Sequence, residues 1–386
     1  MIARIIIPIL LAIVLTDVWF YRRYLRRRRW WWRVLWLLPG LALAISAVAL
    51  VFQPGFLPVR PDGLFTWLFF FGLIVVPKAI YALWSGGGRI WCRLFHKRRN
   101  YANLVGLLSV FIVWYILFYG TFVGFSQLKV KHVELYFTDL PKAFDGYRIL
   151  QFSDAHVGTL TGERRHFLER AVDTMLALKP DMIVFTGDLQ NTHPQELYPH
   201  RDLLARLKAP DGVYSVLGNH DYADYVHCPP SMKVANCRET QSLERQMGWT
   251  LLMNEHRRIN RNGQSLVVAG MENDGDGPFP QLGDVKHTME GVSPNDFVVM
   301  LEHDPTAWQR KILPQCQAQL TLSGHTHAGQ FMLLGWSPVK HRYREWSGLY
   351  HEGNRQLYVS TGLGGLIPFR FGVPGEIVVI TLRLRK

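Results

Sequence analysis

Four long apolar stretches occupy the first third of the chain and constrain what it can fold into. They are roughly Ile2–Phe20, Val34–Phe52, Leu64–Trp84 and Leu104–Phe125. Each approaches or exceeds the ~20 residues that an α-helix needs to cross the apolar core of a bilayer. Their length and near absence of charge argue against buried helices of a soluble protein. The sequence therefore predicts an all-α transmembrane region of four helices in residues 1–127, followed by a separate domain in residues 128–386.

The first stretch has a rival interpretation as a cleaved signal peptide, because Arg4 precedes its apolar core. A signal peptide ends at a cleavage site made of small residues. This stretch runs directly into Tyr21-Arg22-Arg23 instead. We therefore interpret it as a membrane anchor.

The formal net charge of +13 belongs entirely to this N-terminal region. Residues 1–127 hold 15 Lys and Arg against two acids, whereas residues 128–386 hold 28 basic and 28 acidic residues. Nucleic-acid binding would need the basic residues on a soluble face, but they lie between apolar stretches. We expect the lipid bilayer as a partner and no nucleic acid.

The same cations predict the orientation, because Lys and Arg are enriched in short cytoplasmic loops. The first connection contains Arg22, Arg23, Arg26, Arg27, Arg28, Arg29 and Arg33, and the third contains Arg89, Arg93, Lys97, Arg98 and Arg99. The second connection, Gln53–Gly63, has only Arg60, which Asp62 offsets. The first and third connections should face the cytoplasm, which places both termini and the C-terminal domain on the extracytoplasmic side.

Two charged residues, Asp17 and Lys78, fall near the predicted cytoplasmic ends of the first and third stretches. Ionisable groups inside a membrane usually pair with one another or line a functional path. We expect these two to form a structural ion pair.

From residue 128 the pattern changes to short apolar runs, each followed by a loop rich in Asp, Gly, His or Asn. The runs are Val133–Phe137, Tyr147–Phe152, Met182–Phe185, Val213–Leu217, Ser265–Ala269, Phe297–Leu301, Gln319–Leu322, Gln356–Val359 and Ile377–Leu382. Runs of this length that are rich in β-branched residues are typical of buried strands. Helix-like segments, Gly162–Leu178 and Gln195–Lys208, alternate with the early runs. This alternation predicts an α/β domain.

Five short polar motifs follow these runs. They are Asp154-Ala155-His156, Gly187-Asp188, Gly218-Asn219-His220-Asp221, His303 and Gly324-His325-Thr326-His327. Each motif alone is common by chance, and a lone His is usually an ordinary surface or core residue. Functional loops of α/β sheets collect outside the carboxyl ends of the strands. We therefore expect the five motifs to converge at one edge.

The residue types in these motifs are those of a metal site. Carboxylates with imidazoles suit Mn, Fe or Zn, whereas an all-oxygen set would suit Mg or Ca. A structural zinc site normally has four closed ligands, often thiolates, and Cys is absent from the motifs. Seven candidate ligands are too many for one ion and fit two.

The order of these motifs resembles the calcineurin-like metallophosphoesterase superfamily. Further stretches resemble its bacterial membrane-associated branch, namely Ser323–Gln330, Tyr358–Gly364 and Arg370–Ile377. The resemblance covers about residues 145–385 and implies a sandwich of two sheets flanked by helices, in a bacterial inner or plasma membrane protein.

The resemblance also implies which residues bind which metal ion. It assigns one ion to Asp154, His156, Asp188 and His327, and the second to Asp188, Asn219, His303 and His325. Asp188 would bridge the two ions. A metal-bound hydroxide would attack phosphorus, and His220 would protonate the leaving oxygen.

One position departs from the family pattern. Many relatives carry a second acid three residues after the Asp of the Gly-Asp motif, where it orients the catalytic histidine, and here that residue is Asn191. An amide stabilises an imidazolium less than a carboxylate does. Asp221 and Asp304 are the acids that could compensate.

The cysteines leave one question open. Cys228 and Cys237 flank a short Pro-containing segment, and such a pair could form a disulfide in an oxidising compartment. Two unpaired thiols are the alternative.

The sequence therefore predicts a membrane-anchored, metal-dependent phosphoric ester hydrolase. Two other classes stay open: a non-catalytic metal- or phosphate-binding regulatory domain, and a transporter with a regulatory soluble part. The motifs do not separate monoesters, diesters and pyrophosphates. Four spans exceed what anchoring needs, since one helix already inserts almost irreversibly. We hypothesise a lipid-linked substrate, with a soluble phosphoester or nucleotide as the alternative.

Overall fold

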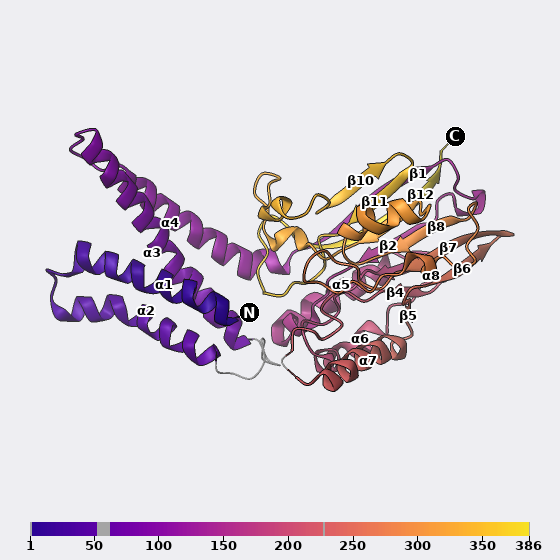
Figure 1. The fold of residues 1–386 in the computed structure, drawn as a ribbon, viewed down its shortest axis with the longest axis horizontal. Coiled ribbons are helices and arrows are strands. Elements are labelled where there is room, and N and C mark those ends of the chain that lie inside the picture. Colours follow the sequence, from indigo (N-terminus) through magenta and orange to yellow (C-terminus); the bar gives the residue numbers. More distant parts are fainter. Residues whose placement is uncertain (1, 52–61, 227, 386) are drawn as a thin grey trace. The chain divides into compact units, whose positions relative to one another are not determined.

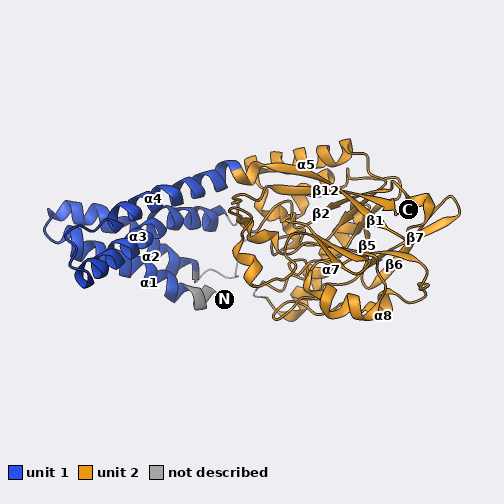
Figure 2. Ribbon diagram, turned by 90° about the horizontal axis from the view of Figure 1, so that it is seen from above, with its two compact units in different colours: residues 1–123 blue, residues 124–386 orange. Residues whose placement is uncertain are grey.

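The computed structural model describes residues 2–51, 62–226 and 228–385. The chain divides into two compact units, Met1–Val123 and Gly124–Lys386 (Figure 2). The first unit is helical, and the second contains all the strands of the described chain.

The first unit consists of four helices. They are α1 (Ile2–Phe20), α2 (Trp30–Val51), α3 (Asp62–Leu94) and α4 (Ala102–Phe118), and a π-helical turn, Tyr21–Leu25, follows α1 (Figure 1). Three segments of the described chain are long and apolar enough to cross a membrane: Trp30–Leu50, Asp62–Leu94 and Ala102–Ser126. The predicted second connection, Gln53–Gly63, lies outside the described residues except for Asp62 and Gly63.

The surfaces of these helices are apolar, because large side chains such as Leu35, Leu108 and Phe111 point outward and are exposed. Such a surface suits lipid rather than water. Inside the unit, Lys78 Nζ lies 2.7 Å from Asp17 Oδ1, which confirms the predicted ion pair. A Cβ atom on Gly40 would stand 2.0 Å from Asp17 Oδ2, so only glycine lets α2 approach the pair this closely.

The second unit is built on two six-stranded sheets. The strands of the first sheet are, in spatial order, β1 (Leu128–Phe137), β12 (Gly375–Leu384), β2 (Arg148–Phe152), β3 (Met182–Phe185), β4 (Val213–Ser215) and β5 (Thr250–Leu251). Those of the second are β10 (Gly348–Glu352), β11 (Arg355–Val359), β9 (Leu320–Ser323), β8 (Phe297–Leu301), β7 (Gln264–Gly270) and β6 (Glu255–Arg261). The predicted α/β class and two-sheet architecture are confirmed.

The strands alternate their side chains between two cores, as the period of a strand requires. On β2, Ile149 belongs to the core that both sheets share, whereas Leu150 and Phe152 belong to the core on the outer face of the first sheet. On β8, Val299 belongs to the shared core and Met300 to the outer core of the second sheet. Both faces of both sheets are therefore covered.

The helices of this unit are α5 (Arg165–Ala177), α6 (Arg201–Leu204), α7 (Pro230–Gln246), α8 (Val285–Thr288) and α9 (Leu313–Gln315). The prediction of a helix at Gly162–Leu178 is confirmed by α5 and the 3-10 turn before it. The helix predicted over Gln195–Lys208 is wrong, because this segment forms two 3-10 turns and the short α6. Pro199 interrupts it, since proline lacks an N–H and restricts the residue before it.

Candidate metal centre

The loops after β2, β3, β4, β8 and β9 bring the predicted metal ligands together. The ligand atoms form two groups, and the atoms within each group all lie within 4.8 Å of one another. The first group is Asp154, His156, Asp188 and His327, and the second is Asp188, His303 and His325. Asp188 belongs to both. β2, β3 and β4 are parallel neighbours, as are β8 and β9, so the carboxyl ends of each set meet at the same edge of their sheet.

In the first group, two imidazole nitrogens face each other. His156 Nε2 lies 3.1 Å from His327 Nε2, and His327 Nε2 lies 3.2 Å from Asp154 Oδ1. Asp188 Oδ2 lies 3.6 Å from His156 Nε2. His156 Nδ1 donates to the carbonyl oxygen of Gln190 at 3.1 Å, so its Nε2 carries a lone pair when the ring is neutral.

In the second group, too, a histidine Nδ1 is bound by a backbone carbonyl oxygen. His303 Nδ1 donates to the carbonyl oxygen of Thr186 at 2.6 Å, and His303 Nε2 lies 3.2 Å from Asp188 Oδ2. Asn219 joins this group, because its Oδ1 lies 2.8 Å from His325 Nδ1. All seven predicted ligands therefore lie in one cluster.

Close approach of the loops depends on glycine. A Cβ atom on Gly218 would stand 2.2 Å from Asp188 Oδ1, and one on Gly324 would stand 2.4 Å from Asp154 Oδ2. Either methyl group would push a candidate ligand out of place. These two glycines of the sequence motifs thus serve the geometry of the carboxylates.

Five of the seven candidate ligands have a left-handed backbone. Their φ angles are +52° for Asp154, +42° for His156, +62° for Asp188, +72° for His325 and +49° for His327. Residues other than Gly rarely adopt this conformation, which costs about 1–3 kcal/mol per residue and is found mainly at functional sites. The sharp turns aim consecutive side chains at one point.

The electrostatics of the cluster favour the protonation states of metal ligands at two positions. Burial lowers the pKa of His156 to about 3, which keeps this ring neutral. Burial alone would raise the pKa of Asp188, but the nearby His303 and His220 hold it well below its ordinary value. Burial opposes a charge on His303 too, yet Asp188 and Asp154 outweigh it and raise the pKa of His303 to about 10. In the absence of ions, a protonated His303 thus neutralises the carboxylates.

The donor set fits two divalent ions. His303 Nε2, His327 Nδ1 and Asp304 Oδ2 are buried without a hydrogen-bond partner among the described residues. The lone pairs of His156 and His327 would repel each other at 3.1 Å unless a cation or a proton lay between them. Carboxylates, imidazoles and one amide oxygen suit Mn, Fe or Zn.

The candidate catalytic residue, His220, lies beside the cluster. Its backbone N–H donates to Asp188 Oδ1 at 2.8 Å, and its ring centroid lies 4.9 Å from that of His156. Its Nδ1 contacts the backbone carbonyl oxygen of Asn191, not the side chain. The side-chain amide of Asn191 donates instead to Thr159 Oγ1 at 2.8 Å. The amide therefore does not take over the role of the second acid.

Asp221 and Asp304, the acids considered as substitutes, make other contacts. Asp221 accepts hydrogen bonds from four backbone N–H groups, those of Asp188, Leu189, Gln190 and Gly218, at 2.8–3.2 Å. It thus shapes the loop that carries Asp188. Asp304 Oδ1 accepts from the N–H and the hydroxyl of Thr306 at 2.9 and 2.7 Å, and Asp304 Oδ2 lies 3.4 Å from His325 Nε2 without forming a hydrogen bond.

A residue that the sequence did not single out, Glu196, holds the turn around Asn191. Its carboxylate accepts from the backbone N–H groups of Asn191, Thr192 and His193 at 2.5, 3.1 and 3.2 Å. This turn presents the Asn191 carbonyl to His220. Three consecutive polar residues before Pro194 give only a weak sequence signal for such a cap.

Two tyrosines near the cluster also lie outside the motifs. Tyr225 OH accepts from Asn219 Nδ2 at 2.8 Å, and its ring centroid lies 4.4 Å from that of His220. Tyr343 OH lies 2.8 Å from His325 Nε2, and burial raises the pKa of this tyrosine to about 12. Burial raises the pKa of Tyr225 as well, so both hydroxyls remain neutral at physiological pH.

The backbone of Asp154 is braced by a C-terminal loop. Gly364 N donates to the carbonyl oxygen of Asp154 at 2.9 Å. Fully buried Arg370 holds this loop by donating to the carbonyl oxygens of Thr361, Gly362, Gly364, Val373 and Pro374. Burial lowers the pKa of Arg370 to about 10.

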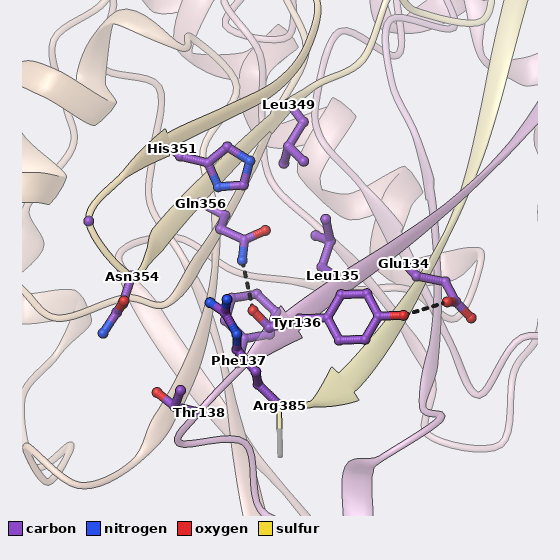
Figure 3. Close-up of a pocket in the computed structure, with 11 residues that line it drawn as sticks. Glu134, Leu135, Tyr136, Phe137, Thr138, Leu349, His351, Asn354, Gln356 and Arg385 are labelled. Atoms are coloured by element: carbon purple, nitrogen blue, oxygen red, sulfur yellow. Dashed lines mark hydrogen bonds between the residues drawn. The ribbon is translucent and has the colours of Figure 1, made fainter.

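A separate hollow of about 310 Å³ lies where β1 ends and β11 begins (Figure 3). Tyr136, His351, Gln356 and Arg385 are among the residues that line it. β11 runs parallel to β9, whose carboxyl end carries His325, so the start of β11 lies at the opposite end of the sheet. The hollow is not part of the metal centre.

The open question about the two cysteines has an answer in the structure. Cys228 and Cys237 are free thiols. Cys237 lies on α7, and burial raises its pKa. A disulfide therefore does not hold this segment.

Two family models match the chain. The model described as calcineurin-like phosphoesterase matches residues 147–329, and the one described as probable calcineurin-like phosphoesterase, transmembrane domain, matches residues 3–125. The residues that the first model matches include all seven candidate ligands.

The chain also resembles individual proteins. It is 32% identical over 259 residues to an uncharacterized metallophosphoesterase of Bacillus subtilis, a match covering 63% of this chain and 82% of that protein. It is 29% identical over 287 residues to a transmembrane protein with metallophosphoesterase domain of Danio rerio, covering 72% of this chain and 62% of that one. A solved phosphopantetheinyl hydrolase of Mycobacterium tuberculosis is 14% identical, with a TM-score of 0.37, covering 58% of this chain and 91% of that one.

Proposed function

The chain belongs to the calcineurin-like phosphoesterase family, and from that premise we propose that it is a membrane-anchored hydrolase of phosphoester or pyrophosphate bonds. The observation that carries the proposal is the position of Asp188, which belongs to both groups of ligand atoms. One carboxylate shared by two groups is the arrangement that a pair of ions about 3.5–4 Å apart requires.

Two divalent ions bound by the seven ligands would supply positive charge for the phosphoryl oxygens and lower the pKa of a water molecule. The chain itself contributes His220, whose Nδ1 is held by a carbonyl. Its Nε2 is then the atom that gives a proton to the leaving oxygen. The Tyr225 ring beside His220 limits the rotation of the imidazole.

The membrane part completes the proposal. We assign four spans, α1 to α4, and place the connections rich in Lys and Arg in the cytoplasm, so the catalytic unit is extracytoplasmic. The apolar outer surfaces of the helices and the mostly uncompensated cations support this assignment. A substrate that is itself lipid-linked would account for spans beyond the one that anchoring needs.

A test uses the full-length protein purified in detergent with Mn, Fe or Zn added, and a chromogenic phosphodiester as the first substrate. We expect metal-dependent hydrolysis that Asp188→Asn abolishes. Metal binding without hydrolysis of any ester would favour the regulatory alternative. A second panel compares membrane phospholipids, lipid-linked pyrophosphates and soluble nucleotides. Preference for the soluble compounds would exclude the lipid-linked substrate while leaving the hydrolase intact.

A further inference from the structure

The turn between α3 and α4 forms a hollow within the first unit. Its volume is about 740 Å³, and Trp91, Lys97, Arg98, Arg99 and Tyr101 are among its lining residues. The hollow lies at the end of one membrane-crossing candidate and the start of the next. It belongs neither to the metal centre nor to the ion pair of Asp17 and Lys78.

Within the first unit, no acidic side chain lies near enough to neutralise its three cations. Residues 1–127 contain only two acids, Asp17 and Asp62. Asp17 pairs with Lys78. Asp62 begins α3, a helix of 33 residues, and at 1.5 Å per residue it stands ~50 Å from the far end of that helix. Within the first unit, the positive charge of the hollow is therefore not compensated by an acidic side chain.

The turn is held by contacts of its own rather than being an open loop. Asn100 Nδ2 donates to the carbonyl oxygen of Ser85 at 2.9 Å, and Cys92 Sγ donates to that of Arg99 at 3.3 Å. A Cβ atom on Gly88 would stand 2.4 Å from Ala102 Cβ, so glycine allows the two helices to close at this point. The cations are thus presented by a defined backbone.

Two aromatic side chains flank the cations. Trp91 is 58% exposed and Tyr101 is 70% exposed. Aromatic residues at helix ends sit at the level of lipid headgroups, and basic pockets between membrane helices suit anionic headgroups. We propose that this hollow binds the headgroup of an anionic phospholipid in the leaflet that the α3–α4 turn contacts. The inference does not depend on the proposed catalytic function.

The test compares three forms of the full-length protein in detergent. They are the wild type, the variant Lys97→Gln/Arg98→Gln/Arg99→Gln, and the matched control Arg26→Gln/Arg27→Gln/Arg28→Gln. The control removes the same charge from exposed residues of the other cationic connection. Native mass spectrometry then measures the binding of dioleoyl phosphatidylglycerol and of dioleoyl phosphatidylcholine to each form.

We expect the wild type and the control to prefer the anionic lipid over the zwitterionic one. Each cation near a headgroup contributes a fewfold in affinity, so the hollow variant should lose about 100-fold, down to the level of the zwitterionic lipid. Equal losses in both variants would show diffuse attraction by the loops and overturn the proposal. Equal binding of both lipids by the wild type would do the same.

Two additions keep the result unambiguous. Soluble glycerophosphoglycerol and inorganic phosphate are added as competitors, and displacement of the lipid by either at similar concentration would identify a free phosphate site instead. If the triple variant does not fold, as judged by its helical circular dichroism, the single variants Arg98→Gln and Arg99→Gln replace it. Each should weaken binding of the anionic lipid about fivefold, and unchanged binding in both would reject the site.

Discussion

The Nδ1 atom of His220 lies 2.6 Å from the carbonyl oxygen of Asn191. A carbonyl oxygen can only accept a hydrogen bond, so the Nδ1 atom carries hydrogen and the Nε2 atom is the one that exchanges protons. The contact comes from the main chain, so it does not depend on which side chain stands at position 191. A carbonyl stabilises an imidazolium less than a carboxylate does, so the proton of His220 is more readily released.

Replacing His220 tests its role as proton donor. His220→Ala should keep the metal content of the wild type, because this ring is not among the clustered ligands. Turnover of an ester with a poor leaving group should fall about 10²–10⁴-fold, whereas a nitrophenyl ester should lose much less. Steady-state kinetics with the two esters measure the difference. Equal losses on both would reject the role.

Asn191→Asp should destabilise the protein rather than improve catalysis. Asn191 Oδ1 and Glu196 Oε2 stand 2.8 and 2.4 Å from the point that a Cβ atom on Gly158 would occupy, so a second carboxylate would crowd the first. We expect a loss of about 3–5 kcal/mol, the cost of an uncompensated buried charge, seen as a lower melting temperature. The double variant Asn191→Asp/Glu196→Gln should recover most of it. No recovery would show that the two carboxylates do not interact.

Asp188→Asn should weaken the binding of both metal ions, because this carboxylate belongs to both ligand groups. The fold should survive, since asparagine tolerates the φ of +62° at this position. Elemental analysis of the purified variant should find fewer than one ion per chain against two in the wild type. Asp173→Asn, an exposed carboxylate paired with Arg206, is the control and should keep both ions. Two ions retained in Asp188→Asn would contradict the shared ligand.

Arg370→Met should weaken the loop that braces Asp154. The variant leaves several buried carbonyl oxygens without a donor, each costing about 1–3 kcal/mol, so unfolding should become easier by at least ~3 kcal/mol. The stability of Arg370→Lys should lie between that of Arg370→Met and that of the wild type, since one ammonium cannot reach all the carbonyls. Thermal unfolding in detergent measures the effect. The exposed Arg383→Met is the control and should melt near the wild-type temperature.

Glu244 on α7 makes stability depend on pH. Burial raises its pKa well above the ordinary value, and its carboxylate has one hydrogen bond, from Ser215 Oγ at 2.5 Å. The pKa of this carboxyl is therefore higher in the folded protein than in the unfolded chain, where it is about 4.3. As the pH rises above that value, the folded protein loses stability. Glu244→Gln should therefore raise the melting temperature more at pH 8 than at pH 5. The control Glu163→Gln, at an exposed position, should show no such difference. An equal change in the melting temperature of Glu244→Gln at both pH values would refute the prediction.

Much of the second unit could be predicted because its strands are buried on both faces. Met182–Phe185 and Phe297–Leu301 are continuous apolar runs, and the structure gives β3 and β8 the same bounds. The polar residues that follow such runs converge by the geometry of parallel strands. This geometry explains why the five motifs could be expected at one edge, whereas the choice of the seven candidate ligands within them came from the resemblance to the family.

The elements that were missed lack a pattern of that kind. The buried face of α7 is formed by Asn236, Thr240, Leu243 and Glu244, so it has no apolar periodicity to predict a helix. Glu196 and Tyr343 act on the centre through the fold of loops that have no fixed spacing from the motifs. Their roles follow from tertiary contacts that a single sequence does not encode locally.

The left-handed backbone at Asp154, His156, Asp188, His325 and His327 has an evolutionary consequence. Glycine or asparagine would adopt this backbone conformation with less strain. A relative that does not need the ligands would therefore gain stability from substitutions to those residues. We expect aspartate and histidine to persist at these positions only in relatives that still need them as ligands. Inspecting these five positions in relatives would therefore separate working hydrolases from inactive descendants before any assay.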